Sequence, residues 1–260
     1  MIYLKTDEEI EMMRQSNLLV GKTLGELAKW IAPGITTLKL DRIAYEFIND
    51  NGAKPGFLGY GGFPASICTS VNEVVVHGIP SNQTLRDGDI ISIDCGVVLN
   101  GFNGDSAFTF TVGEVDPKVE KLLATTRAAL YKGIEQAVEN NRIGHIGNAV
   151  QTYCESRGYS VVRELTGHGI GRRLHEDPAV PNYGRRGVGA LLKNGMCIAI
   201  EPMINLGSKN VVIESDGWTC RTRDRQPSAH FEHTVAIRGE RADILSTFDY
   251  VDEVLNKDKS

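Results

Sequence analysis

Three acidic residues interrupt apolar segments that otherwise have the pattern of buried β-strands. An isolated carboxylate that is buried in a strand lowers the stability of a fold by more than the strand contributes, so such groups are normally neutralised, paired or bound to a cation. The chain must therefore fold so that these acids meet each other or meet a metal ion. The three residues are Asp94, Glu201 and Glu232, within residues 91–98, 197–203 and 231–235 respectively.

A fourth acid, Asp105, is placed opposite Asp94 by a predicted hairpin. Residues 89–112 contain two apolar runs around Asn100-Gly101, and Asn-Gly is a strong signal for a hairpin turn. The two aspartates are eleven residues apart and are predicted to lie within a residue or two of each other across the strands. Like charges at that spacing repel each other unless a cation lies between them. The alternative is a pair of aspartates that flank the turn on a solvated face.

A glycine-rich segment supplies a candidate imidazole ligand. His168 lies in Thr-Gly-His-Gly-Ile-Gly, residues 166–171, where the glycines allow a tight bend and a close approach. For His168 a loop histidine with a purely structural role is an open alternative. His175 follows on the same loop and can return to the same cleft. Four carboxylates and one imidazole suit a hard or borderline divalent ion such as Mn, Fe, Co or Zn.

The residues next to Glu201 and Glu232 indicate which side chains are candidate metal ligands and which are expected to pack in the core. Pro202 forces an extended backbone at Glu201. On a continuous strand over residues 230–238, Glu232 shares one face with His230, while His233 points to the other face and is expected to pack or to support the site. His145, at a predicted helix start, is expected to be structural.

Composition excludes several classes of protein. The 260 residues are 41% hydrophobic and 23% charged with a net charge of −5, which argues against a general nucleic-acid binder. The five cysteines form no C-x-x-C pair, which argues against a zinc finger and a disulfide framework and favours a reducing compartment. We find no leader pattern and no apolar run near the ~20 residues that a membrane span requires, so a cytoplasmic protein without membrane contact is expected.

The order of predicted elements indicates one α+β domain, residues 1–248, built from two similar halves, with a charged and frayed tail at 249–260. A capping box at Thr6 starts the first helix. The predicted helices cover residues 7–31, 37–52, 117–140 and 146–157. The predicted strands cover residues 66–71, the hairpin 89–112, and residues 159–163, 195–203, 211–214 and 230–238.

These motifs resemble those of the type I methionine aminopeptidases of peptidase family M24, in the short bacterial form. The resemblance covers nearly the whole chain and implies the single-domain pita-bread fold, with two halves related by a pseudo-two-fold axis. It also implies a metal-dependent enzyme that removes the N-terminal methionine from peptides and nascent chains when the second residue is small. The matching segments are residues 72–80, 94–96, 103–105, 166–171, 200–202 and 231–235.

The resemblance also implies roles for individual residues. Two divalent ions (Co, Mn, Fe, Zn or Ni) would be held by Asp94, Asp105, His168, Glu201 and Glu232, with Asp105 and Glu232 bridging both. A bridging water or hydroxide would attack the scissile carbonyl. His77 would hydrogen-bond the scissile amide, His175 would stabilise the oxyanion, and Glu201 would also shuttle a proton.

The methionine pocket implied by the resemblance consists of Tyr60, Phe63, Cys68 and Trp218, because aromatic edges and a thiol suit a thioether. Packing in the core is the alternative for any single aromatic residue. Two positions depart from the family pattern: Phe57 stands where a smaller residue is expected, and Leu174 stands where an aromatic is common. Neither is a predicted metal ligand.

Two rival functions are considered. An X-Pro peptidase of the same fold would carry a large domain before its metal half, and here the first predicted ligand is already Asp94. A catalytically inactive relative that acts as a binding protein would be expected to have lost ligands, and all five are present. We expect a monomer that binds no nucleic acid, with the ribosome as a candidate partner.

Overall fold

The computed structural model of the protein describes residues 1–257, and its first half is built on two helices and a long hairpin. Helix α1 (Asp7–Ala28) starts at the predicted capping box, in which the Thr6 hydroxyl accepts from the Glu9 amide. Helix α2 (Thr37–Asp50) begins where predicted, at the Thr36 cap. Strands β4 (Ile90–Leu99) and β5 (Phe102–Thr111) form the predicted hairpin. Asn100 and Gly101 form its turn with φ values of 54° and 77°, as this turn type requires.

The hairpin register places the two aspartates diagonally. Gly96 pairs with Asp105, and Asp94 pairs with Ala107, so the acids are offset by two positions on adjacent strands. Strand β2 (Ile67–Val71) pairs with the other side of β4, and the short β1 (Lys54–Pro55) completes this four-stranded sheet. The prediction of a diagonal contact is therefore confirmed.

The second half repeats the plan of two helices followed by antiparallel strands. Helix α4 (Ile143–Glu155) lies close to its predicted range, but α3 (Pro117–Ile134) ends earlier than the predicted residue 140. After Ile134 the backbone tightens into short-range turns, and Asn140 takes a positive φ of 70°, which ends the helical path. The strands that follow these helices form three small sheets, one of which also includes β3 (Val74–Val76) of the first half.

Each of the three sheets is antiparallel. The five-stranded sheet has the order β15 (Arg241–Ile244), β14 (His233–Arg238), β9 (Cys197–Ile200), β7 (Gly167–Gly169), β8 (Glu176–Val180). A three-stranded sheet has the order β13 (Ser228–His230), β10 (Met203–Asn205), β6 (Ser160–Val161). The other three-stranded sheet has the order β11 (Val211–Ile213), β12 (Cys220–Thr222), β3 (Val74–Val76). A short 3₁₀ helix, η1, covers Tyr60–Gly62.

Two predicted strands are wrong in one respect: each is broken at its acidic residue. The predicted strand 195–203 divides into β9 and β10 at Glu201-Pro202, where Pro202 has no amide to continue the ladder. The predicted strand 230–238 divides into β13 and β14, because the Glu232 amide donates to Ala107 of β5 instead of to a ladder partner. At both breaks the chain passes between the same two sheets.

The predicted frayed tail is also wrong within the described residues. Residues 249–257 form helix α5 (Asp249–Lys257), while residues 258–260 lie outside the described part of the chain. Val251 is fully buried, and the Asp252 carboxylate pairs with Arg127 at 2.5 Å. Helix α5 packs closely on α1, since a Cβ on Gly25 would lie only 2.7 Å from the Tyr250 Cβ. The apolar stripe of the segment, which sequence analysis overlooked, explains why it docks.

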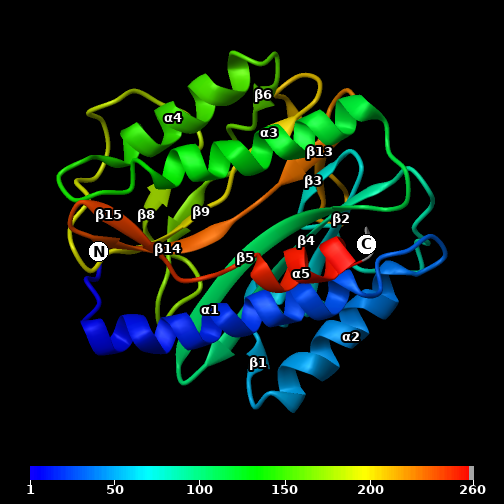
Figure 1. Ribbon diagram of the computed structural model, residues 1–260, viewed down its shortest axis with the longest axis horizontal. Coiled ribbons are helices and arrows are strands. Elements are labelled where there is room, and N and C mark those ends of the chain that lie inside the picture. The colour runs from blue at the N-terminus through cyan, green and yellow to red at the C-terminus, as the bar shows by residue number, and fades with distance from the viewer. Residues whose placement is uncertain (258–260) are drawn as a thin grey trace.

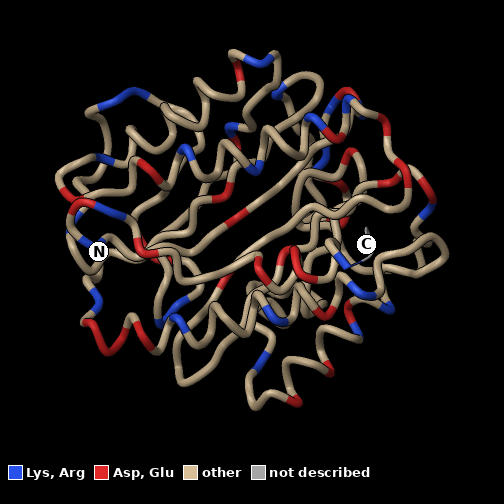
Figure 2. Tube along the Cα trace, in the orientation of Figure 1, with Lys and Arg blue, Asp and Glu red and all other residues tan. Residues whose placement is uncertain are grey.

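One hydrophobic core joins both halves, which confirms the prediction of a single α+β domain. In the view of Figure 1, α3 and α4 lie on one side of the strands, and α1, α2 and α5 lie on the other. Figure 2 shows basic and acidic residues interspersed over the outer helices and loops. No helix within residues 1–257 has both the length and the apolar character that a membrane span requires.

Candidate metal centre

Five predicted ligands line a single cavity between the two halves of the domain. Asp94 and Asp105 come from the hairpin, His168 comes from β7, and Glu201 and Glu232 come from the two breaks between sheets. The breaks explain why the last two carboxylates can point into a cavity, since neither residue belongs to a strand ladder. The fold thus brings together residues that span positions 94 to 232 of the chain.

The donor atoms are close enough to share a cation. One donor atom each from Asp105, His168 and Glu232 lie within 4.8 Å of one another. The His168 Nε2 atom is 3.7 Å from Asp105 Oδ2 and 3.7 Å from Glu201 Oε1. Asp94 joins this group because its carboxyl group shares a hydrogen bond with that of Asp105.

The acids are buried, and their hydrogen bonds do not compensate for the loss of solvation. Asp105 is 3% and Glu232 is 2% exposed. Burial raises the pKa of Asp94 to about 7. The pKa values of Asp105, Glu201 and Glu232 are raised well above their ordinary values. Burial is the largest cause, and the negative charges of neighbouring acids add to it. One carboxylate oxygen each of Asp94, Asp105 and Glu232 is buried with no hydrogen-bond partner. This donor set fits divalent metal ions, which supply the missing positive charge.

The orientation of His168 suits a ligand. Its Nδ1 atom donates to the carbonyl oxygen of Gly169 at 2.9 Å, which leaves Nε2 facing the carboxylates with its lone pair. Burial lowers the pKa of His168 to about 3, so the ring is neutral. A neutral imidazole whose other nitrogen bonds a backbone carbonyl is the usual arrangement of a metal-binding histidine.

The two other predicted histidines lie beside the acids in the same cavity. The rings of His168 and His175 meet edge to face with centroids 4.1 Å apart, and the Tyr60 hydroxyl bonds His175 Nδ1 at 2.7 Å. His77 has a positive φ of 59° and meets the edge of Trp218. Burial lowers the pKa values of both His77 and His175, which favours neutral rings.

The predicted aromatic and thiol residues line the same cavity and give it an apolar wall. Phe63 and Cys68 are buried, Phe63 and Trp218 meet edge to face at 5.2 Å, and Tyr60 is partly exposed at the rim. Phe57 and Leu174, the two departures from the family pattern, also line the cavity. Phe57 packs directly over Gly96, where a Cβ would lie 2.4 Å from its ring. Both therefore contribute to the pocket wall.

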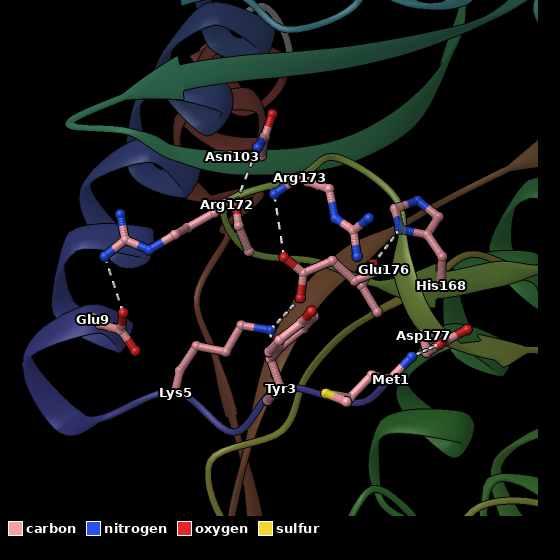
Figure 3. A network of polar contacts seen from close by, with 12 residues as sticks. Met1, Tyr3, Lys5, Glu9, Asn103, His168, Arg172, Arg173, Glu176 and Asp177 are labelled. Carbon is pink, nitrogen blue, oxygen red and sulfur yellow. Dashed lines mark hydrogen bonds and ion pairs between the residues drawn. The ribbon is translucent and has the colours of Figure 1, made fainter.

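A network of polar contacts holds the loop between β7 and β8, which follows His168 (Figure 3). His175 lies on this loop. The Lys5 ammonium pairs with Glu176 at 2.6 Å, and both side chains are buried. The second oxygen of Glu176 accepts from the Arg173 amide. Asn103, on β5, donates to the Gly171 carbonyl oxygen from both its backbone and its side chain. The N-terminal segment and the hairpin therefore fix the backbone on both sides of His175.

Sequence analysis missed His230 as a site residue. Its Nε2 atom lies 3.8 Å from Glu201 Oε2 and 3.9 Å from Glu232 Oε2. The available signal was its i, i+2 spacing from Glu232. His233 points away from the acids, as predicted, and bonds Tyr131 and Ser246. His145 Nδ1 accepts a hydrogen bond from the Arg142 amide at the start of α4, in agreement with the predicted structural role of His145.

Comparison with known proteins gives a consistent result. Residues 11–239 match metallopeptidase family M24. A methionine aminopeptidase of Clostridium acetobutylicum is 52% identical over 95% of this chain and 99% of its own. The crystal structure of methionine aminopeptidase from Rickettsia prowazekii superposes with a TM-score of 0.94 at 43% identity, over 95% of this chain and all of that one.

A prolidase from Pyrococcus furiosus shares the fold, with a TM-score of 0.76 at 24% identity. It matches 94% of this chain but only 65% of the prolidase chain. The pita-bread fold expected from the sequence is thereby confirmed. The much higher identity to methionine aminopeptidases separates the chain from the X-Pro peptidases.

Proposed function

The chain belongs to the methionine aminopeptidases of metallopeptidase family M24, and we propose that it removes the N-terminal methionine from peptides and nascent proteins whose second residue is small. The observation that carries the proposal is the single cavity in which four buried acids and His168 meet an apolar wall of aromatic rings and a thiol. The acids suit a metal-dependent hydrolysis, and the wall suits an unbranched thioether side chain.

The proposed metal centre has two divalent ions held by Asp94, Asp105, His168, Glu201 and Glu232. Cobalt, manganese, iron, zinc and nickel all suit this donor set, in which oxygen ligands dominate. Bound ions of this kind activate a water molecule and polarise a carbonyl group. The unpartnered buried oxygens of Asp94, Asp105 and Glu232 support the assignment, because each still requires a positive partner.

The remaining polar groups are proposed to act on the substrate. Glu201 accepts the proton of the attacking water and delivers it to the leaving amine. Because the Tyr60 hydroxyl engages His175 Nδ1, the Nε2 atom is the ring nitrogen available to stabilise the developing oxyanion. His77 is proposed to hydrogen-bond the scissile amide.

The pocket of Tyr60, Phe63, Cys68 and Trp218 is proposed to hold the methionine side chain. The acids line the same cavity as these four residues, so a free amine placed among the acids fixes cleavage after one residue. The side chain of the second residue then lies near His77 and the acids, which limits its size. Substrate peptides are thus expected to begin with methionine followed by glycine, alanine or serine.

We further propose that the protein acts as a monomer on chains that emerge from the ribosome in the cytoplasm. All five cysteines are unpaired and buried, which supports a reducing compartment.

The test compares three tripeptides with the purified protein and added Mn²⁺ or Co²⁺. Methionine should be released from Met-Ala-Ser and not from Met-Lys-Ser, and Ala-Pro-Ser should be left intact. An Asp94→Asn variant, which removes one charge from the centre, should lose the activity and keep the fold by circular dichroism. Equal rates on the two methionine peptides would contradict the size limit. Cleavage of Ala-Pro-Ser alone would indicate an X-Pro peptidase.

A further inference from the structure

His230 is a fully buried histidine whose ring has no hydrogen-bond partner within the described residues. It is 1% exposed, and neither Nδ1 nor Nε2 is bonded. The backbone of the residue is well fixed, because its amide donates to Thr109 Oγ1 at 3.0 Å and its carbonyl accepts from the same hydroxyl at 2.7 Å. A buried polar group without a hydrogen-bond partner lowers the stability of the fold, so its presence here requires another explanation.

The ring points at two of the proposed metal-binding carboxylates. Its Nε2 atom is 3.8 Å from Glu201 Oε2 and 3.9 Å from Glu232 Oε2. The other oxygen of Glu201, Oε1, faces His168 Nε2 at 3.7 Å. Glu201 therefore lies between two imidazoles, one for each carboxylate oxygen.

We propose that His230 is a positioning residue that donates a hydrogen bond from Nε2 to Glu201 Oε2 and so holds this carboxylate in its metal-binding orientation. The inference rests on the proposed function, since it assumes that Glu201 binds a metal ion. The contact is about 1 Å longer than an N–H···O hydrogen bond, a gap that a small rotation of the Glu201 side chain closes.

A donor role explains the arrangement better than a ligand role. A metal ligand must lie about 2.0–2.2 Å from the ion. The donor atoms within 4.8 Å of one another include one from His168, and Glu201 turns Oε1 toward His168 but Oε2 toward His230. His230 therefore meets Glu201 at the oxygen that does not face His168. Groups that hydrogen-bond a metal-binding carboxylate from behind restrict its rotation, and losing one typically reduces metal affinity or activity by 10–100-fold.

The experiment uses two substitutions that separate a donor from a ligand. His230→Gln keeps an N–H donor of similar reach but is a weak metal ligand, whereas His230→Leu keeps the volume and removes the donor. The matched control is His233→Gln, because His233 is equally buried but bonds Tyr131 and Ser246, away from the acids. Mn²⁺ affinity and stoichiometry are measured by calorimetric titration of the chelator-treated proteins, together with kcat and KM for Met-Ala-Ser.

We expect His230→Leu to bind Mn²⁺ 10–100-fold more weakly at unchanged stoichiometry, and His230→Gln to stay within about threefold of the unsubstituted protein. His233→Gln should leave Mn²⁺ affinity unchanged. Loss of one equivalent of Mn²⁺ in both His230 variants would make His230 a ligand and overturn the proposal. Normal affinity in His230→Leu would reduce the residue to packing and would also overturn it.

A measurement on the unsubstituted protein covers the case in which His230→Leu does not fold. In protein labelled with ¹⁵N-histidine and loaded with Zn²⁺, a donor must carry its proton on Nε2, whereas a ligand must not. A proton on Nε2 of His230 supports the proposal, and an unprotonated Nε2 overturns it. If the His230 effects on Mn²⁺ binding occur but no methionine is released from any peptide, the proposed function fails and the positioning role stands.

Discussion

The buried ion pair between Lys5 and Glu176 gives the sharpest test of how the loop of His175 is held. The Lys5 and Glu176 side chains are only 6% and 4% exposed, and their charged atoms are 2.6 Å apart. Removing one partner of a buried pair leaves an uncompensated charge, which lowers the free energy of unfolding by about 3–5 kcal/mol. Lys5→Met should therefore destabilise the protein by that amount.

A matched surface pair provides the reference. Arg42 and Glu46 on α2 are 2.7 Å apart, but their side chains are 72% and 52% exposed. Arg42→Met should leave the free energy of unfolding close to that of the unsubstituted protein, because water screens the charge that remains. Urea unfolding of both variants, compared by midpoint at constant slope, measures the difference. Equal losses in the two variants would refute the argument from burial.

A double variant separates the effect of the ion pair on fold stability from its effect on the position of His175. Lys5→Met combined with Glu176→Leu removes both charges, so most of the lost stability should return. The backbone near His175 would still lack the bond from the Arg173 amide to the Glu176 carboxylate. We expect kcat for Met-Ala-Ser to be lower in this stable double variant than in the unsubstituted protein, with its metal content unchanged. Full kcat would show that the pair only stabilises the fold.

Three further predictions follow from the site and the packing. His175→Ala should lower kcat by ~10²–10³ with little change in KM or metal content, and loss of a metal equivalent would make His175 a ligand. In protein treated with a chelator, the raised pKa values of acids such as Asp94 and Asp105 mean that the folded state holds protons that the unfolded state has released. Their contribution to stability is complete at low pH and is lost as pH rises through the folded pKa values. Above about pH 7.5 the buried histidines are neutral in the folded state, and in the unfolded chain about nine-tenths of each is neutral. From there to pH 8 the free energy of unfolding should fall at about 1.4 kcal/mol per pH unit for each acid still protonated, and a flat or rising free energy would contradict the sign. Gly25→Ala should destabilise the protein by about 1–3 kcal/mol in urea unfolding, because the new methyl group meets Tyr250 of α5, and a net gain from helix propensity would show that α5 is loosely packed.

The hairpin and the first helix could be predicted because their determinants are local. The Asn100-Gly101 turn fixes the pairing of β4 with β5, and the register then fixes the offset between Asp94 and Asp105. The capping box at Thr6 is a local hydrogen-bond pattern in the same way. Such features depend on residues a few positions apart and are therefore visible in the sequence.

The break at Glu232 could not be predicted because its cause lies far away in the chain, whereas Pro202 is a local signal for the break at Glu201. The Glu232 amide bonds Ala107, and the Glu232 carbonyl accepts from the Ser106 hydroxyl. No local pattern indicates that β5 replaces the expected ladder partner. The partner of Glu176 was invisible for the same reason, since Lys5 is distant in sequence and its charge suggests a solvated residue.

The wide spacing of the candidate ligands links catalysis to the order of folding. The hairpin brings Asp94 and Asp105 together early, because their strands are joined by a tight turn. Glu201 and Glu232 join them only when the second half of the domain has docked, since each is positioned by contacts between sheets. A partly synthesised or half-folded copy therefore has two aspartates and no complete centre. A peptidase assembled in this way stays inert until its own chain has folded.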